Sequence, residues 1–276
     1  MSTRVSLARQ GDVAFLHLDS PDGLHVLSTA VLREMRAHLA ALREAPDLLA
    51  AVLTGRGHRA FSAGADLREL AELEPASALT FSALGQGVGE ALAALPVPVI
   101  AVLNGAAYGG GVELAVACDL RLATSEARLQ YQAARLGLLP GWGGTQRLPG
   151  LVGPGRARRL MLGCEQLDAA TALAWGLVDG VAPATELSAL LAARLADLRQ
   201  ADPRALRETK RALRGALPTT FALEREAFAA CFEGGTTQAR IRAWLERTRA
   251  ASPAASPSVA ASPDGPTSVP GPAAGA

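Results

Sequence analysis

Short apolar runs alternate with helix-like stretches along the first two-thirds of the chain, and this alternation constrains the fold more than any other feature. The strand-like runs are Val13–Leu18, Leu49–Thr54, Pro98–Leu103 and Leu120–Ala123. Helical periodicity fills the intervals, from Ser28 to about Glu44, from about Ala76 to Ala94, and over Gly111–Cys118. Strands that alternate with helices favour a largely parallel sheet, so we expect an α/β core.

The rest of the chain predicts a different organisation. From Gly153 onward the pattern is nearly all helical, with helices expected near residues 184–199, 203–215, 218–232 and 236–249. From Ala251 the composition turns to Pro, Ser, Gly and Ala with one charged residue, which is typical of a disordered tail. We therefore predict a core domain over 1–195, a C-terminal helical region over 196–250 and a disordered tail over 251–276.

Composition and charge argue against several classes of protein. Hydrophobic residues make up 49% of the 276 and charged residues 19%, which suits a well-filled globular core. A net charge of +1 gives no reason to expect a nucleic acid or an acidic membrane as partner. No apolar run reaches the roughly 18 residues that a membrane span needs. The start, Met1–Gln10, lacks the basic and apolar regions of a signal peptide.

Cysteine and histidine usage gives two further expectations. The three cysteines (Cys118, Cys164 and Cys231) are an odd number, lie far apart and sit in apolar runs. They are typical of buried free thiols in a reducing compartment, so we expect a cytoplasmic protein. None of the four histidines has metal-ligand spacing with a second histidine or cysteine, so we expect no metal site.

Two glycine-containing segments follow predicted strands. In the first, Phe61–Asp66, Gly64 lies between small residues, which permits a tight bend and leaves backbone N–H groups accessible. Taken alone, this segment favours a plain tight turn in which Asp66 begins a helix. The second segment, Tyr108–Ala115, joins three glycines to a carboxylate, Glu113, at the start of a predicted helix.

The beginning of that helix predicts an anion site. The first N–H groups of a helix lack internal partners and carry the positive end of its dipole. Glu113 lies three residues after Gly110, so it shares that helix face and leans toward the N-terminus. The segment predicts a carboxylate beside an anion-binding N–H group. The alternative is a glycine-rich packing turn with a solvated Glu113, or a Glu113 that only stabilises the first helical turn.

Together the two segments resemble the paired signatures of the crotonase superfamily, the enoyl-CoA hydratase/isomerase family. Further matches follow in order: Cys118-Asp119, then Leu136–Pro140 leading into Gly141–Leu148, then Ala169 to Asp179. The resemblance covers roughly residues 4 to 248. It implies a ClpP/crotonase-like spiral of ββα units with a helical C-terminal region that builds a homotrimer or a dimer of trimers.

The resemblance also implies the ligand and the residues that bind it. The substrate is an acyl-CoA thioester, and no separate cofactor is needed because coenzyme A is part of the substrate. The thioester oxygen would lie between the backbone N–H groups of Ala65 and Gly110, beside the catalytic Glu113. Contacts with the substrate or its CoA are implied for Arg59, Ala63, Gly64, Asp66, Gly109, Gly141 and Trp142.

One position departs from the family pattern. Family hydratases pair two glutamates, and the second is expected about 20 residues after Glu113, where this chain has Ala133. No acidic residue lies between Glu126, which stands at the wrong place, and Glu165. Tyr131 and Gln132 lie close enough in sequence to be candidates for the missing acid. Loss of one general acid or base typically costs roughly 10²- to 10⁴-fold in rate.

Three functions stay open at this point. The first hypothesis is an enoyl-CoA hydratase-type lyase of fatty acid metabolism, the activity that dominates the family. The second is a short-chain acyl-CoA decarboxylase of the methylmalonyl- or ethylmalonyl-CoA type, because decarboxylation needs only the oxyanion hole and one acid. The third is a catalytically weak family member that serves as a scaffold. His25, where the family usually has Asn, is interpreted as a structural variant.

Overall fold

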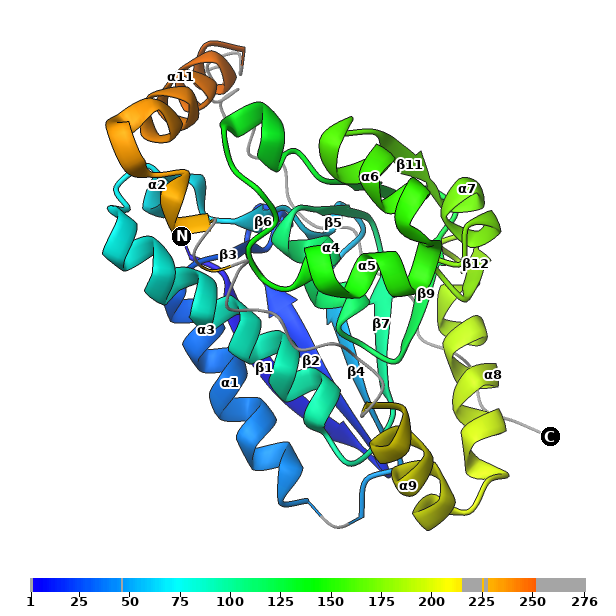
Figure 1. Ribbon diagram of the computed structural model, residues 1–276. Helices are drawn as coiled ribbons and strands as arrows, with labels where there is room; N and C mark the ends of the chain where they lie inside the picture. The colour runs from blue at the N-terminus through cyan, green and yellow to red at the C-terminus, as the bar shows by residue number, and fades with distance from the viewer. Residues whose placement is uncertain (1, 46, 215–224, 226–227, 252–276) are drawn as a thin grey trace, which may run out of the picture.

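The four predicted strands belong to one six-stranded sheet in the computed structural model, which describes residues 2–45, 47–214, 225 and 228–251 (Figure 1). Its spatial order is β1 (Arg4–Gln10), β2 (Val13–Asp19), β4 (Ala50–Gly55), β7 (Val99–Leu103), β9 (Leu120–Thr124) and β12 (Gly180–Ala182). β1 and β2 form an antiparallel hairpin, and every later pairing in this sheet is parallel. The expected α/β core with a largely parallel sheet is confirmed.

Shorter strands build two further sheets. One has the order β11 (Gln166–Asp168), β10 (Arg128–Gln130), β8 (Ala106–Tyr108) and β5 (Ala60–Ser62), and the other pairs β3 (Val26–Leu27) with β6 (Gly64–Ala65). β4, β7 and β9 of the large sheet are each followed by a strand of the four-stranded sheet and then by a helix. This repeat is the spiral of ββα units that the resemblance implies. The expectation of almost pure helix after Gly153 was wrong at β11 and β12.

The helices lie close to where the sequence predicts them. Their bounds are α1 (Thr29–Arg43), α2 (Leu67–Leu70), α3 (Pro75–Ala94), α4 (Gly110–Val116), α5 (Gly144–Val152), α6 (Pro154–Leu162), α7 (Ala169–Ala174), α8 (Leu187–Arg199), α9 (Pro203–Arg214) and α11 (Thr236–Ala251), with 3₁₀ turns η1 (Ala133–Leu136) and η2 (Glu233–Gly235). Ser28 caps α1 by accepting from Val31 N at 3.3 Å, and Asp168 caps α7 by accepting from Thr171 N at 2.8 Å. The predicted helix at 218–232 and the tail beyond 251 fall mostly or wholly outside the described residues.

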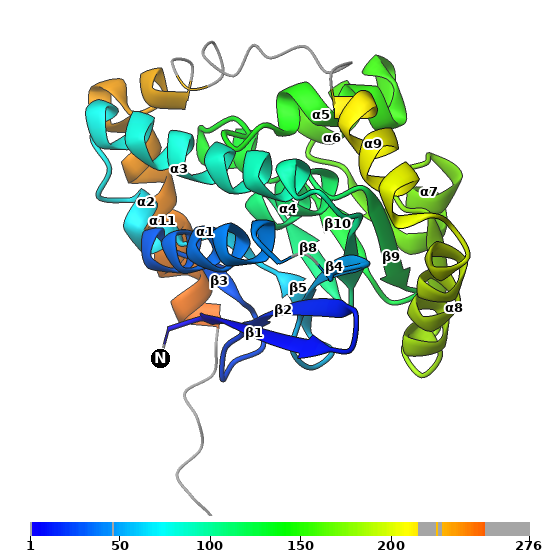
Figure 2. The ribbon, with the colours of Figure 1, turned by 90° about the horizontal axis from the view of Figure 1, so that it is seen from below.

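The large sheet separates two hydrophobic cores. Successive side chains of a strand point to opposite faces, so Ala51 and Leu53 of β4 join one core while Ala50 and Val52 join the other. α1 and α3 lie side by side over the first face (Figures 1 and 2). The second face is covered by α8, which contributes Leu187. The predicted boundary at 195/196 falls inside this helix.

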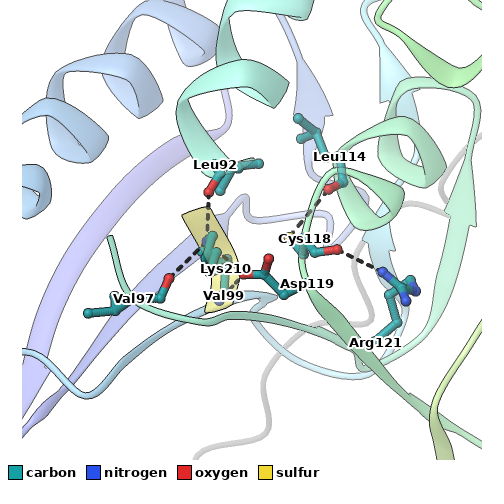
Figure 3. Close-up of polar contacts among 8 residues, drawn as sticks. All are labelled: Leu92, Val97, Val99, Leu114, Cys118, Asp119, Arg121 and Lys210. Carbon is teal, nitrogen blue, oxygen red and sulfur yellow. Dashed lines mark hydrogen bonds and ion pairs between the residues drawn. The ribbon is translucent and has the colours of Figure 1, made fainter. Parts of the chain in front are cut away.

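α9 is attached to the body of the molecule through the single lysine of the chain, Lys210. Its buried ammonium lies 2.7 Å from Asp119 Oδ2 and donates to Val97 O at 2.8 Å and Leu92 O at 3.4 Å (Figure 3). Asp119 also accepts from Val99 N at 2.7 Å. The C-terminal helical region is therefore joined to the end of α3 and the start of β7.

The three cysteines are free thiols. Cys118 and Cys164 are buried as expected, whereas Cys231 is half-buried. Burial, reinforced by the neighbouring Asp119, raises the pKa of Cys118 to about 12, so this thiol stays protonated. Across the described part of the chain, no helix combines the length and the apolar character that a membrane crossing requires.

Candidate active site

The two glycine segments meet in the folded chain, at a distance that side chains would not permit. A Cβ on Gly64 would lie 2.5 Å from Tyr108 O and 3.3 Å from Gly110 N. A Cβ on Gly111 would lie 2.7 Å from Ser62 O. Gly64 also has φ +87°, a conformation that favours glycine. The absent side chains are thus what allows these backbones to pack together.

Backbone hydrogen bonds hold both segments in place. Gly109 precedes α4 with φ 47°, donates to Gln130 O at 2.9 Å and accepts from Glu113 N at 3.1 Å. In the first segment, Ala63 N donates to Leu24 O at 2.7 Å. The first turn of α4 is therefore fixed to β10, and the Gly64 turn to the residues beside β3.

A cavity of about 370 Å³ opens beside this contact. Its lining is mostly apolar and comprises Leu24, Ala63, Gly64, Ala65, Leu67, Leu70, Phe81, Tyr108, Gly109, Gly110, Glu113, Tyr131, Gln132, Ala133, Leu136, Leu138, Leu139, Pro140, Gly141, Trp142, Phe228 and Trp244. The predicted site residues are all in this lining except Arg59 and Asp66. An apolar cavity with few polar groups is the usual form of a small-molecule site.

Arg59 and Asp66 have other positions. Arg59 is exposed and its Nη1 donates to Asp22 O at 2.9 Å. Asp66 caps α2 by accepting from Arg68 N at 2.9 Å. Asp66 thus has the helix-entry role that the sequence offered as the plainer alternative.

Glu113 is buried, with 4% of its surface exposed, so the solvated alternative is wrong. Its Oε1 accepts hydrogen bonds from Trp142 N at 2.8 Å and Gly144 N at 2.9 Å. Hydrogen bonds between a carboxylate and backbone N–H groups are among the stronger ones in proteins. The Gly141–Gly144 loop thereby holds this carboxylate in one orientation at the cavity wall.

That loop is itself held from two helices. Gly141 O accepts from Ser82 Oγ at 2.6 Å and from Gln86 Nε2 at 3.1 Å, and both donors are on α3. Trp142 O accepts from Arg147 Nη1 at 3.0 Å. Sequence reasoning missed these three buried donors. For the two donors on α3, the one available signal was the spacing of Ser82 and Gln86, which places both side chains on one face of the helix, one turn apart.

The cavity wall also contains the departure from the family pattern. Ala133 begins η1 and lines the cavity beside Tyr131 and Gln132. Within the described lining, Glu113 is the one carboxylate, and no lysine, arginine or histidine is present. Glu126 is exposed between β9 and β10, where hydrogen bonds from Thr124 and Ser125 hold its pKa below the usual range. It lies on the surface, as its sequence position indicated.

His25 has a structural role. The ring is fully buried, with Nδ1 3.1 Å from Ser20 Oγ and Nε2 2.9 Å from Arg56 O. Its φ of 52° lies in the left-handed region, and its carbonyl accepts from Ser62 Oγ at 2.8 Å. Through this hydrogen bond with Ser62, His25 helps to hold the Gly64 segment in place. The described residues contain no group of three or more His, Cys, Asp or Glu placed to hold a metal ion.

Comparisons with known proteins point to one family. The profile of the family described as enoyl-CoA hydratase/isomerase matches residues 8–251. Short-chain-enoyl-CoA hydratase from Clostridium acetobutylicum is 36% identical over 249 residues, 89% of this chain and 95% of that protein. Crotonyl-CoA hydratase from Syntrophomonas wolfei is 34% identical over 250 residues, 89% of this chain and 96% of that protein. A crystal structure of an enoyl-CoA hydratase from Mycobacterium avium subsp. paratuberculosis superposes with a TM-score of 0.79 at 28% identity, over 86% of this chain and 97% of that one.

Proposed function

The chain belongs to the enoyl-CoA hydratase/isomerase family of enzymes, and from this premise we propose that it stabilises the enolate of an acyl-CoA thioester between the N–H groups of Ala65 and Gly110. Both residues line the same cavity, on two backbone segments that touch. A preorganised backbone donor of this kind is worth about 3–4 kcal/mol of transition-state stabilisation.

The proposed reaction is the hydration of a short 2-enoyl-CoA. Glu113 takes a proton from water, the water oxygen bonds to C3, and the π electrons move to the thioester oxygen as the enolate forms. C2 then takes a proton back from Glu113, so that the elements of water are added across the double bond. The observation that carries this proposal is the buried Glu113 carboxylate, fixed at the cavity wall by two N–H groups.

The test replaces this carboxylate with its amide. Glu113→Gln is expected to lower kcat for hydration by about 10²- to 10⁴-fold. Binding of a saturated acyl-CoA, measured by calorimetry, is expected to persist. Glu126→Gln is the matched control, because that carboxylate is exposed and outside the cavity. Hydration at an undiminished rate in Glu113→Gln would refute the role proposed for Glu113.

A second candidate, decarboxylation of a methylmalonyl- or ethylmalonyl-CoA, is favoured by one observation. Ala133 brings only an apolar side chain to the wall, and the described lining offers no cation to a substrate carboxylate. A carboxylate placed there loses its hydration shell, which favours cleavage of its C–C bond. CO₂ leaves, the bonding electrons enter the enolate, and Glu113 in its protonated form donates a proton to C2 and is then reprotonated from solvent.

Ala133→Glu separates the two candidates. A second carboxylate at this position is expected to raise the rate of 2-enoyl-CoA hydration by about tenfold or more if hydration is limited by the missing acid. The same change is expected to lower CO₂ release from the malonyl-type thioesters, because like charges repel. CO₂ release that exceeds hydration in the wild-type protein would favour the second candidate. No turnover of any thioester, with CoA binding retained, would favour the scaffold alternative.

The proposed oligomeric state, cellular location and pathway follow from the same family resemblance. We propose a homotrimer or a dimer of trimers that acts in the cytoplasm in fatty acid metabolism, with no cofactor beyond the coenzyme A of its substrate. Light scattering of the purified protein is expected to give three or six times the chain mass of 28.4 kDa. A monomer at micromolar concentration would contradict this assembly.

A further inference from the structure

The indole of Trp142 occupies space that two glycines leave open. A Cβ on Gly85 would lie 2.2 Å from Trp142 Cδ1, and a Cβ on Gly110 would lie 2.3 Å from Trp142 Cζ3. Gly85 belongs to α3 and Gly110 to α4, so two helices present bare backbone to one ring. The indole therefore fills a slot between these helices that an alanine at either position would close.

Of the glycines in α3, Gly85 is the one that the close approach of this ring explains. Glycine is unfavourable in a helix interior relative to alanine, and Gly85 lies near the middle of α3. Gly87, two residues further along, shows the contrast, since a Cβ there would meet only Arg36 at 3.9 Å. Close approach of the indole thus distinguishes Gly85 from its neighbour.

The same ring is part of the cavity wall. Trp142 is 3% exposed, packs against Phe81 with ring centroids 5.4 Å apart, and lines the cavity together with Glu113. The indole that fills the slot between α3 and α4 is therefore also part of the cavity wall.

The backbone of Trp142 is held too firmly for the ring to serve as a moving gate. Its N–H donates to Glu113, its carbonyl accepts from Arg147, and the preceding carbonyl is held by Ser82 and Gln86. A ring fixed in this way sets a constant limit on the length of the cavity.

We propose that Trp142 determines acyl-chain length, limiting the site to short acyl-CoA thioesters by filling the slot that a longer chain would enter. This inference rests on the proposed function of the cavity as an acyl-thioester site. The selectivity for acyl-chain length comes from the indole and not from the reacting groups. The inference therefore applies to hydration and decarboxylation alike.

The test measures binding rather than turnover. Calorimetry with the saturated thioesters butyryl-CoA and octanoyl-CoA is expected to give a wild-type Kd at least about tenfold lower for the shorter chain, because methylenes that do not fit are rejected on this scale. Trp142→Ala is expected to reverse the preference, and Trp142→Leu to give an intermediate result in a better-filled core. Trp175→Ala is the matched control, since Trp175 lies outside the cavity beneath Arg156 and Arg159.

A reciprocal substitution tests the slot itself. Gly85→Ala is expected to destabilise the wild-type protein but to be tolerated in the Trp142→Ala background, whereas Gly87→Ala is tolerated in both. Unchanged chain preference in both Trp142 variants, with butyryl-CoA bound, would overturn this inference and leave the proposed function standing. Failure of wild-type protein to bind either thioester would instead overturn the proposed function, and the inference with it.

Discussion

One methyl group at Gly64 is enough to separate the two segments that form the site. Gly64→Ala places a Cβ 2.5 Å from Tyr108 O at φ +87°, so we expect a loss of about 1–3 kcal/mol in the free energy of unfolding. Turnover is expected to fall further, because Gly110 must move. Denaturant unfolding monitored by circular dichroism gives the measurement. Gly155→Ala, which meets nothing within 4 Å, is the control and is expected to change stability by less than about 1 kcal/mol.

For single residues, the sequence predicts the helix face on which Glu113 lies but not the hydrogen-bond partners of its carboxylate. Its spacing from Gly110 is a local property, because three residues along a helix place a side chain on a known face. The hydrogen bonds from Trp142 N and Gly144 N come from a loop about thirty residues downstream. No local pattern encodes a contact between backbone N–H groups and a distant carboxylate, so the solvated and buried interpretations stayed open until the fold was known.

For the elements, the attachment of α9 depends on one buried charge. Lys210→Met leaves Asp119 without its cation and removes one donor from each of two carbonyls, Leu92 O and Val97 O, and we expect a loss of about 3 kcal/mol in unfolding free energy. Lys210→Arg is not expected to restore stability, because a planar guanidinium cannot replace a compact ammonium among three acceptors. Arg211→Met, on the exposed side of the same helix, is the control. A near-neutral Lys210→Met in chemical denaturation would contradict this account.

Helices were more predictable than strands for a physical reason. Caps such as Ser28 and Asp168 are local signals, and the structure confirms both. β11 has three residues and pairs antiparallel with β10, so that Leu129 faces Leu167. A strand this short has too few residues to show a periodicity, and its pairing is decided by packing between distant segments. The prediction of nearly all helix after Gly153 was wrong at β11 and β12 for that reason.

For the whole molecule, stability is expected to fall below about pH 6.5 in part through His17. Burial, with the nearby positive charge of Arg56, lowers the pKa of His17 from 6.5. The unfolded chain therefore binds this proton at a higher pH than the folded chain does. Stability is lost as the pH falls from the unfolded pKa of 6.5 toward the lower pKa of the folded state. His17→Gln is expected to lose less stability between pH 7 and pH 5 than the wild type. Exposed His58→Gln is the control, and equal losses in all three proteins would refute this assignment.

The overall fold was the most predictable level. The alternation of runs such as Leu49–Thr54 with helical stretches indicated the parallel sheet, and the ordered motifs indicated the spiral. Neither could specify how residues on the two faces of β4 divide between two cores, because that depends on which helices cover each face. The prediction was therefore correct in architecture and incomplete in packing.

Lys210 has a practical consequence for chemical modification of the protein. It is the single lysine in the sequence, and its ammonium is buried against Asp119 and two carbonyls. Every other basic charge on the molecule apart from the amino terminus belongs to arginine or histidine, which amine-reactive esters do not acylate stably. One dye, biotin or surface linker per native chain is thus expected, attached at the amino terminus, and the appearance of a second label would report the release of α9.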